Sequence, residues 1–158
     1  MRMCAACATN GTIRPLRFYL DTNVIISAAE KTDAFGARQA LFFTHIDEGR
    51  IEALTSEITL AECLVKPFAG KDMMAVEAYN AFLGEQSGLP VIPVSREILI
   101  SAARLRAVSG LKLPDAIHMV TAKWTGCSAF VTNDRRIKGD DDMRVVLWDQ
   151  LTEADFTP

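Results

Sequence analysis

The stretch "FYLDTNVIIS", residues 18 to 27, places one acid inside an otherwise apolar run. The residues before Asp21 are typical of a short buried strand, while Thr22 or Asn23 after it supplies a side chain that favours the start of a helix. A strand that passes directly into a helix puts Asp21 at the carboxyl end of the strand. A carboxylate beside buried apolar residues costs free energy unless its charge is compensated, so this position is a candidate for function.

Strands and helices alternate along the rest of the chain. Short apolar runs predict strands at residues 16–21, 51–56, 89–94, 129–133 and 144–149. Helical spacing of apolar residues, with capping residues and terminal glycines, predicts helices at residues 24–31, 37–50, 57–65, 71–86, 96–110 and 113–126. This alternation is typical of an α/β fold in which a mainly parallel sheet is covered on both faces.

Two of these helices carry more detailed expectations. The helix that opens after Ser56 is expected to end before Pro67, because proline lacks the N–H of a helical hydrogen bond. The helix of residues 71–86 is expected to turn five side chains toward the core, namely Met73, Val76, Ala78, Tyr79 and Phe82.

Length and charge limit the classes of protein that the chain can belong to. At 158 residues it is predicted to form one domain over residues 16–158, preceded by a tail at residues 1–15 that is either disordered or a mis-assigned start. A formal net charge of −3 excludes a strongly basic DNA-coating protein but allows local basic clusters. No apolar run approaches the ~20 residues of a membrane span, and the tail is unlike a signal peptide, so a cytoplasmic location is expected.

The cysteines give a weak signal. Cys4 and Cys7 form a C-x2-C pair, but no second Cys or His pair follows at the spacing of a zinc site. All four cysteines are interpreted as reduced thiols of an intracellular protein.

Four acids recur where strands end or helices begin. Asp21 ends the first strand, Asp134 follows the fourth, Asp115 lies in the first turn of a helix, and Glu62 lies mid-helix among apolar neighbours. Taken singly, Asp115 could favour a helix start, Asp134 a turn and Glu62 a solvated face. Together they predict a cluster, in which two carboxylates about 5 Å apart repel by roughly 3 kcal/mol. Such a cluster needs protons or a cation, and oxygen ligands without His or Cys favour Mg²⁺ or Mn²⁺ over zinc.

The sequence resembles PIN-domain ribonucleases, specifically the VapC toxins of bacterial toxin–antitoxin pairs. The resemblance runs from about Arg17 to Trp148 and is carried by four motifs in order: "YLDTNVII" (19–26), "TSEITLAECLVKP" (55–67), "LKLPDAIHMVTA" (111–122) and "FVTNDRRI" (130–137). It implies a three-layer α/β/α sandwich around a five-stranded sheet, a Mg²⁺ or Mn²⁺ site, and endonucleolytic cleavage of structured RNA such as tRNA or rRNA.

The resemblance also implies roles for individual residues and partners. By position, Asp21, Glu62, Asp115 and Asp134 match the acidic quartet that binds metal and catalyses, and Asn23, Thr132 and Asn133 match residues that support the site. It further implies a homodimer and a cognate VapB-like antitoxin that blocks the site. Two features depart from the family pattern: the residues before the first strand, and three further acids near the fourth member of the quartet, Asp140, Asp141 and Asp142, among which the sequence does not choose.

Other polar residues have two interpretations each. His118 could act as a base or ligand, but an imidazole bonded within the fold is the favoured interpretation. Lys112, Arg135 and Arg136 are candidate RNA contacts, with Arg104, Arg106 and Lys138 as further possibilities, and the alternative is a solvated basic surface.

Competing functions receive less support. A phosphatase that forms an aspartyl-phosphate would want a second Asp where this chain has Asn23, and a receiver domain would want paired acids at the first strand. A non-enzymatic alternative is a PIN-fold protein that binds RNA or a partner without a toxin role. The intact set of acids argues against it, because an inactive site has no reason to keep charges that repel.

Overall fold

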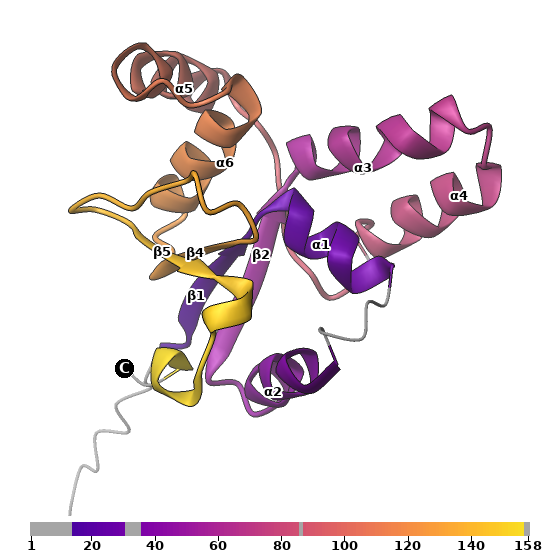
Figure 1. The fold of residues 1–158 in the computed structure, drawn as a ribbon, viewed down its shortest axis with the longest axis horizontal. Coiled ribbons are helices and arrows are strands. Elements are labelled where there is room, and N and C mark those ends of the chain that lie inside the picture. Colours follow the sequence, from indigo (N-terminus) through magenta and orange to yellow (C-terminus); the bar gives the residue numbers. More distant parts are fainter. Residues whose placement is uncertain (1–13, 31–35, 86, 157–158) are drawn as a thin grey trace, which may run out of the picture.

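The computed structural model describes residues 14–30, 36–85 and 87–156. Most of the predicted tail, with Cys4 and Cys7, lies outside these residues. A five-stranded sheet forms the centre of the molecule, with every neighbouring pair parallel and the strand order β3-β2-β1-β4-β5 (Figure 1). The strands are β1 (Leu16–Leu20), β2 (Ile51–Ser56), β3 (Val91–Ile92), β4 (Ala129–Thr132) and β5 (Arg144–Leu147).

The central strand β1 fixes which residues meet at the edge of the sheet. It pairs with β2 on one side and with β4 on the other, where Leu20 is opposite Val131. The backbone N–H of Asp21 extends this ladder by donating to the Val131 carbonyl at 2.9 Å. The residues that follow β1 and end β4 therefore lie side by side, at the edge where ligands bind in open α/β sheets.

Six α-helices surround the sheet within the described residues. They are α1 (Thr22–Ala29), α2 (Gly36–Asp47), α3 (Glu57–Ala69), α4 (Met73–Phe82), α5 (Arg96–Ser109) and α6 (Leu113–Trp124). Two short 3-10 turns, Trp148–Gln150 and Glu153–Phe156, follow β5. None of the helices within the described ranges is both long and apolar enough to cross a lipid bilayer.

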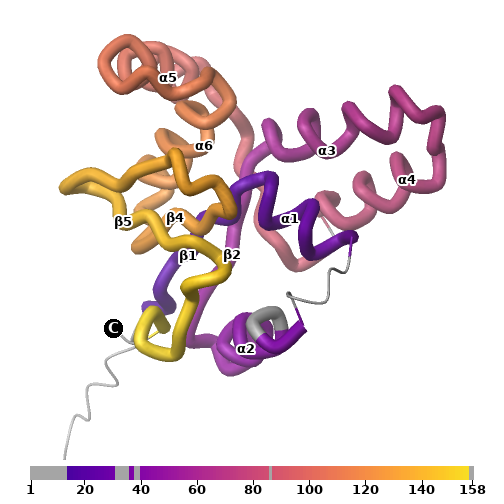
Figure 2. Tube along the Cα trace, in the orientation of Figure 1, coloured from indigo at the N-terminus to yellow at the C-terminus, as the bar shows by residue number. Residues whose placement is uncertain are grey.

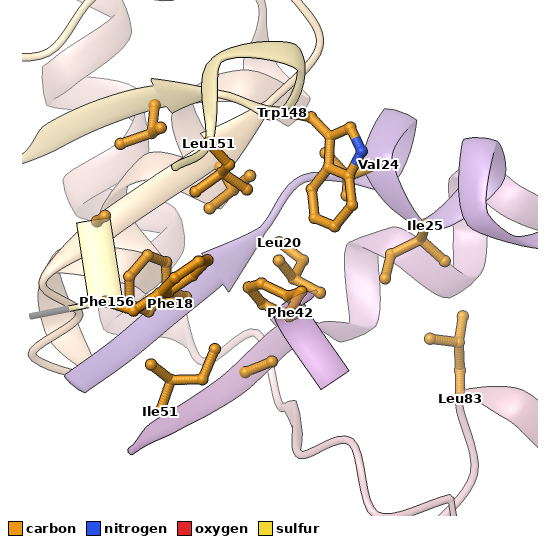
Figure 3. Packing of buried hydrophobic residues seen from close by; sticks show 14 of the residues in the cluster. Phe18, Leu20, Val24, Ile25, Phe42, Ile51, Leu83, Trp148, Leu151 and Phe156 are labelled. Carbon is orange, nitrogen blue, oxygen red and sulfur yellow. The ribbon is translucent and has the colours of Figure 1, made fainter. Parts of the chain in front are cut away.

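Alternation along β1 divides the core between the two faces of the sheet. Phe18 and Leu20 belong to a cluster that includes residues of α1, α2 and the C-terminal 3-10 turns (Figure 3). Tyr19 points to the opposite face, where it stacks on Phe130 with ring centroids 5.4 Å apart and joins Met119 of α6. Helix α5 packs outside α6. The predicted three-layer α/β/α fold is confirmed.

Helix α3 is longer than the sequence predicts, because it continues through Pro67 to Ala69. Pro67 lies in the last turn, where its ring is buried and its missing N–H costs the helix one hydrogen bond. The Pro67 carbonyl accepts from Asp72 N–H at 2.9 Å, so the chain turns into α4 without losing that acceptor. The expected end before Pro67 is wrong, because a proline in the last turn of a helix removes only one hydrogen bond and the helix continues past it.

Helix α4 buries less than the sequence predicts. Val76 is buried and Tyr79 is half-buried, but Met73, Ala78 and Phe82 are exposed. The reason is that α4 packs against α3 and not flat on the sheet, as Figure 2 shows for the two tubes beside each other. A neighbouring helix covers a narrower part of a helix surface than a sheet does, so the apolar side chains of α4 beside the covered part remain exposed to solvent.

Substituting Phe18 by alanine should lower the free energy of unfolding by about 3–5 kcal/mol, because Phe18 is fully buried and leaves a cavity. Urea denaturation measures the change. The matched control is Phe68→Ala, which truncates a phenylalanine that is 55% exposed and should cost much less. Equal losses in the two variants would contradict this account of the core.

Candidate active site

Asp21 is a buried acid at the junction of β1 and α1. Its side chain caps the helix by accepting from Thr22 N–H at 2.7 Å, and its other oxygen accepts from Thr132 Oγ1 at 2.6 Å and Asn23 Nδ2 at 2.7 Å. Burial raises the pKa of Asp21 in spite of these donors and of nearby His118, and the charge of Glu62 raises it further. The carboxylate is thus well held but incompletely compensated in charge.

Three residues that the sequence marked as supporting the site form one hydrogen-bonded frame. Asn23 donates to Thr132 Oγ1 at 3.0 Å, and its amide oxygen accepts from Asn133 N–H at 2.8 Å. The Thr132 hydroxyl oxygen also accepts from Asp134 N–H at 2.9 Å. The start of α1 is therefore tied to the turn after β4, which orients both Asp21 and Asp134.

Glu62 reaches the same place from α3. Its Oε2 accepts from Thr22 Oγ1 at 2.6 Å and lies 2.9 Å from His118 Nε2. Burial would raise the pKa of Glu62, but the hydrogen bonds from His118 and Thr22 outweigh burial, so the pKa is lowered. The sequence predicts helix capping by Thr22 or Asn23, but the cap is Asp21. The Thr22 hydroxyl instead bonds Glu62, and its place in the motif "LDTN" is the only sequence signal for this contact.

Asp115 and Asp134 complete the set of predicted acids. Asp115 lies in the first turn of α6, where burial raises its pKa against the effect of His118, and the charges of Asp134 and Glu62 raise it further. Asp134 accepts from the guanidinium and the backbone N–H of Arg136, and these bonds hold the pKa of Asp134 at about 2. The four acids therefore share one electrostatic environment, in which two have raised and two have lowered pKa values.

The oxygen atoms of these side chains suit a hard divalent cation as ligands. Carboxylate and hydroxyl oxygens are its preferred ligands, and the raised pKa values of Asp21 and Asp115 mark negative charge that a cation would relieve. Within the described ranges, no three His, Cys, Asp or Glu side chains are already gathered as a metal site. Mg²⁺ keeps several of its waters when it binds to proteins, so it can be held by one or two carboxylates.

The structure brings some of the basic residues and further acids that the sequence offered close to the four acids and keeps others away from them. Lys112 and Arg136 lie close enough to affect the pKa values of the acids, Lys112 acting on both Asp115 and Asp134. Arg135 turns away and pairs with Asp149. Asp140 is tied to Lys123 at the far end of α6, and Asp142 lies 4.0 Å from that same Lys123. That end of α6 is about 12 Å from Asp115 at 1.5 Å per residue.

Comparison with known proteins identifies the family to which the chain belongs. The model of the PIN domain family matches residues 18–139, which span all four acids. The chain belongs to the PIN domain family. A comparison with curated proteins found no match.

Solved structures of a toxin–antitoxin complex and of two VapBC complexes share the fold. A toxin–antitoxin complex from Klebsiella pneumoniae is 26% identical over 81% of this chain and 94% of that chain, with a TM-score of 0.60. VapBC2 from Rickettsia felis, bound to a DNA fragment from its promoter, is 19% identical over 84% and 99% of the two chains, with a TM-score of 0.65. DNA-bound VapBC from Salmonella typhimurium is 23% identical over 84% and 98%, with a TM-score of 0.60.

Replacing Asp115 by asparagine should raise the melting temperature of the metal-free protein near neutral pH. The pKa of Asp115 is raised in the folded protein, so the ionised carboxylate destabilises the fold above that pKa. The advantage of the variant should shrink as pH falls through the raised pKa, because the wild-type carboxyl then takes up a proton and recovers the stability. Thermal unfolding in EDTA, from about pH 7 to about pH 4, measures both effects.

The control for this variant is Asp142→Asn, which removes the same charge from a side chain that is 85% exposed. The two variants should differ clearly near neutral pH. Equal shifts, or a lower melting temperature for Asp115→Asn, would contradict the raised pKa.

Proposed function

We propose that this PIN protein is a metal-dependent RNA endonuclease that acts as the toxin of a toxin–antitoxin pair. The observation that carries the proposal is the buried carboxylate of Asp21, held by three donors beside three further acids at the carboxyl edge of the sheet. A fold that keeps an uncompensated buried charge loses stability, which is reasonable when the charge serves a ligand. Membership of the PIN domain family supports nuclease chemistry.

In the proposed reaction the acids bind the cation and do not attack the substrate. Asp21 and Asp115, whose charges are least compensated, are the first choices as ligands, with Glu62 and Asp134 able to join them. Mg²⁺ or Mn²⁺ would act as a Lewis acid on a phosphate oxygen and make water a stronger nucleophile toward phosphorus. Structured RNA, such as tRNA or rRNA, is the proposed substrate.

Two basic side chains near the acids are the proposed contacts for the phosphate backbone. Arg136 lies at Asp134 on the exposed side of the site, and Lys112 precedes α6. Arg136 already neutralises Asp134. A bound phosphate would therefore compete with Asp134 for Arg136, and a bound cation would compete with Arg136 for Asp134. Arg136 would then turn to the RNA as Asp134 turns to the metal.

The same structure offers a surface for the proposed antitoxin. A groove of about 760 Å³ lies between α1, α3 and α4, with Glu62 among its lining residues and Phe43 and Phe82 along its apolar part. A segment bound in the groove would reach the acids at Glu62. The toxin–antitoxin complex from Klebsiella pneumoniae supports such a partner for this chain. We further propose a homodimer, which sedimentation of the purified chain tests.

Purified protein should cut structured RNA in the presence of Mg²⁺ or Mn²⁺ and should not cut it in EDTA. Asp21→Asn and Glu62→Gln should each reduce the cleavage rate by more than about 100-fold, because the loss of a residue that only orients a metal ligand already costs about 10–100-fold. Asp142→Asn, at a distant exposed acid, is the control and should keep full activity. Cleavage in EDTA would contradict the proposed metal dependence. Wild-type protein that binds RNA without cutting it under any of these conditions would favour the non-enzymatic alternative.

The same assay separates the two adjacent arginines. Arg136→Gln should raise KM more than Arg135→Gln does, because Arg136 lies at the acids while Arg135 pairs with Asp149. Equal effects of the two changes would contradict the assignment of Arg136 as a phosphate contact.

Co-expression with the proposed antitoxin, whose gene is expected beside that of this protein, tests the groove. Ala78→Glu places a charge in the apolar part of the groove and should prevent the two proteins from co-purifying, because an unpaired buried charge opposes binding. Met74→Glu, on the same helix but outside the groove and 83% exposed, should leave co-purification unchanged. Loss with both variants, or with neither, would place the antitoxin elsewhere.

A further inference from the structure

His118 lies between the acids and the core of the protein. It belongs to α6, is 1% exposed, and meets polar atoms at both ring nitrogens. Nε2 lies 2.9 Å from Glu62 Oε2, 3.1 Å from Thr22 Oγ1 and 3.8 Å from Asp21 Oδ1. Nδ1 lies 2.8 Å from the Tyr19 hydroxyl. The imidazole therefore links Glu62 to the central strand.

The direction of the bond at Nε2 follows from its neighbours. Thr22 has one hydroxyl proton, and its closest acceptor is Glu62 Oε2 at 2.6 Å. An ionised carboxylate has no proton to give. Both neighbours of Nε2 thus accept hydrogen bonds, so Nε2 must carry a proton whether the ring is neutral or charged.

The other side of the ring fixes its orientation. The Tyr19 hydroxyl that meets Nδ1 also bonds the Ser56 hydroxyl at 2.7 Å. A phenol can donate or accept, so it suits Nδ1 in either state of the ring. The Tyr19 ring is itself stacked on Phe130 and meets the edge of the imidazole at a centroid distance of 5.7 Å. His118 consequently has little room to turn.

Glu62 needs such a partner because its own helix does not hold it. Its side chain is 35% exposed and borders the groove beside α3. A glutamate has three rotatable side-chain bonds, and restricting them costs rotamer entropy. Without donors at the inner end, the carboxylate could turn outward into the groove, away from Asp21.

We propose that His118 is a positioning residue that, through its Nε2–H and with Tyr19 behind it, aims the Glu62 carboxylate at the acidic edge of the sheet. The proposal rests on the proposed function, in which Glu62 acts at the metal site. It makes His118 a donor to an acid and excludes it as a base that removes a proton from water.

The hydrogen bond can be tested without any nuclease activity. Imidazole ¹⁵N–¹H correlation spectra of the metal-free full chain report which nitrogens carry protons. The chain has two histidines, so a His45→Gln variant leaves His118 alone and assigns its signals. A protonated Nε2 supports the proposal, whereas an unprotonated Nε2 overturns it. This outcome is independent of the RNA assay, so a failure of the proposed function is seen separately.

The functional consequence is tested by two substitutions. His118→Gln keeps an N–H near the position of Nε2, and His118→Leu removes it. In RNA cleavage, His118→Leu should lose about 10–100-fold in kcat, as is usual for partners that orient a metal ligand, and His118→Gln should keep most of the rate. The rise in melting temperature on adding Mg²⁺ should follow the same order. Equal losses in both variants would make His118 merely structural and overturn the proposal, as would full activity of His118→Leu.

Tyr19→Phe carries the test should His118→Leu fail to fold by circular dichroism. Removing the hydroxyl leaves Nδ1 without its partner and lets the ring turn, so kcat should fall severalfold, while Nε2 stays protonated because Glu62 and Thr22 still accept from it. An unchanged kcat would overturn the role given to Tyr19.

Discussion

The burial of one carboxylate, that of Asp21, is the constraint around which the rest of the structure is arranged. An ionised acid with 4% exposure is tolerated because three donors converge on it from the start of α1 and the end of β4. Those donors can converge because β1 pairs in parallel with β4 and passes at once into a helix. The central position of β1, the frame of Asn23 and Thr132, and the approach of α3 and α6 all serve that arrangement.

The four acids differ in how far neighbouring groups compensate their negative charge. Glu62 and Asp134 have strong local donors, in Thr22 with His118 and in Arg136, and their pKa values are lowered. Asp21 and Asp115 are more buried than compensated, and their pKa values are raised. The same edge of the sheet thus contains two satisfied acids and two that gain from a positive partner.

The features that were predictable from the sequence are those that depend on local chemistry. The strand that leads to Asp21 and the polar group around Asn23 follow from residues that are neighbours along the chain, whereas the helix cap is Asp21 and not Thr22 or Asn23 as the sequence predicts. Other features depend on what a helix packs against. The periodicity of α4 is the same whether a sheet or α3 covers it, so the exposure of Met73 could not be read from it. In the same way, adjacency in sequence could not show that Arg135 pairs with Asp149 while Arg136 pairs with Asp134. Nor could it show that Thr22 donates a hydrogen bond to Glu62.

The link between Asp21 and Thr132 joins residues that are 111 positions apart. Chains emerge from the ribosome N-terminus first, and contacts of high sequence separation form late because their loops must close. The acid is synthesised 111 residues before the hydroxyl that holds it. The finished edge can therefore form only after β4 has been made, and a product that stops before β4 carries Asp21 and Glu62 without the strand that completes their surroundings.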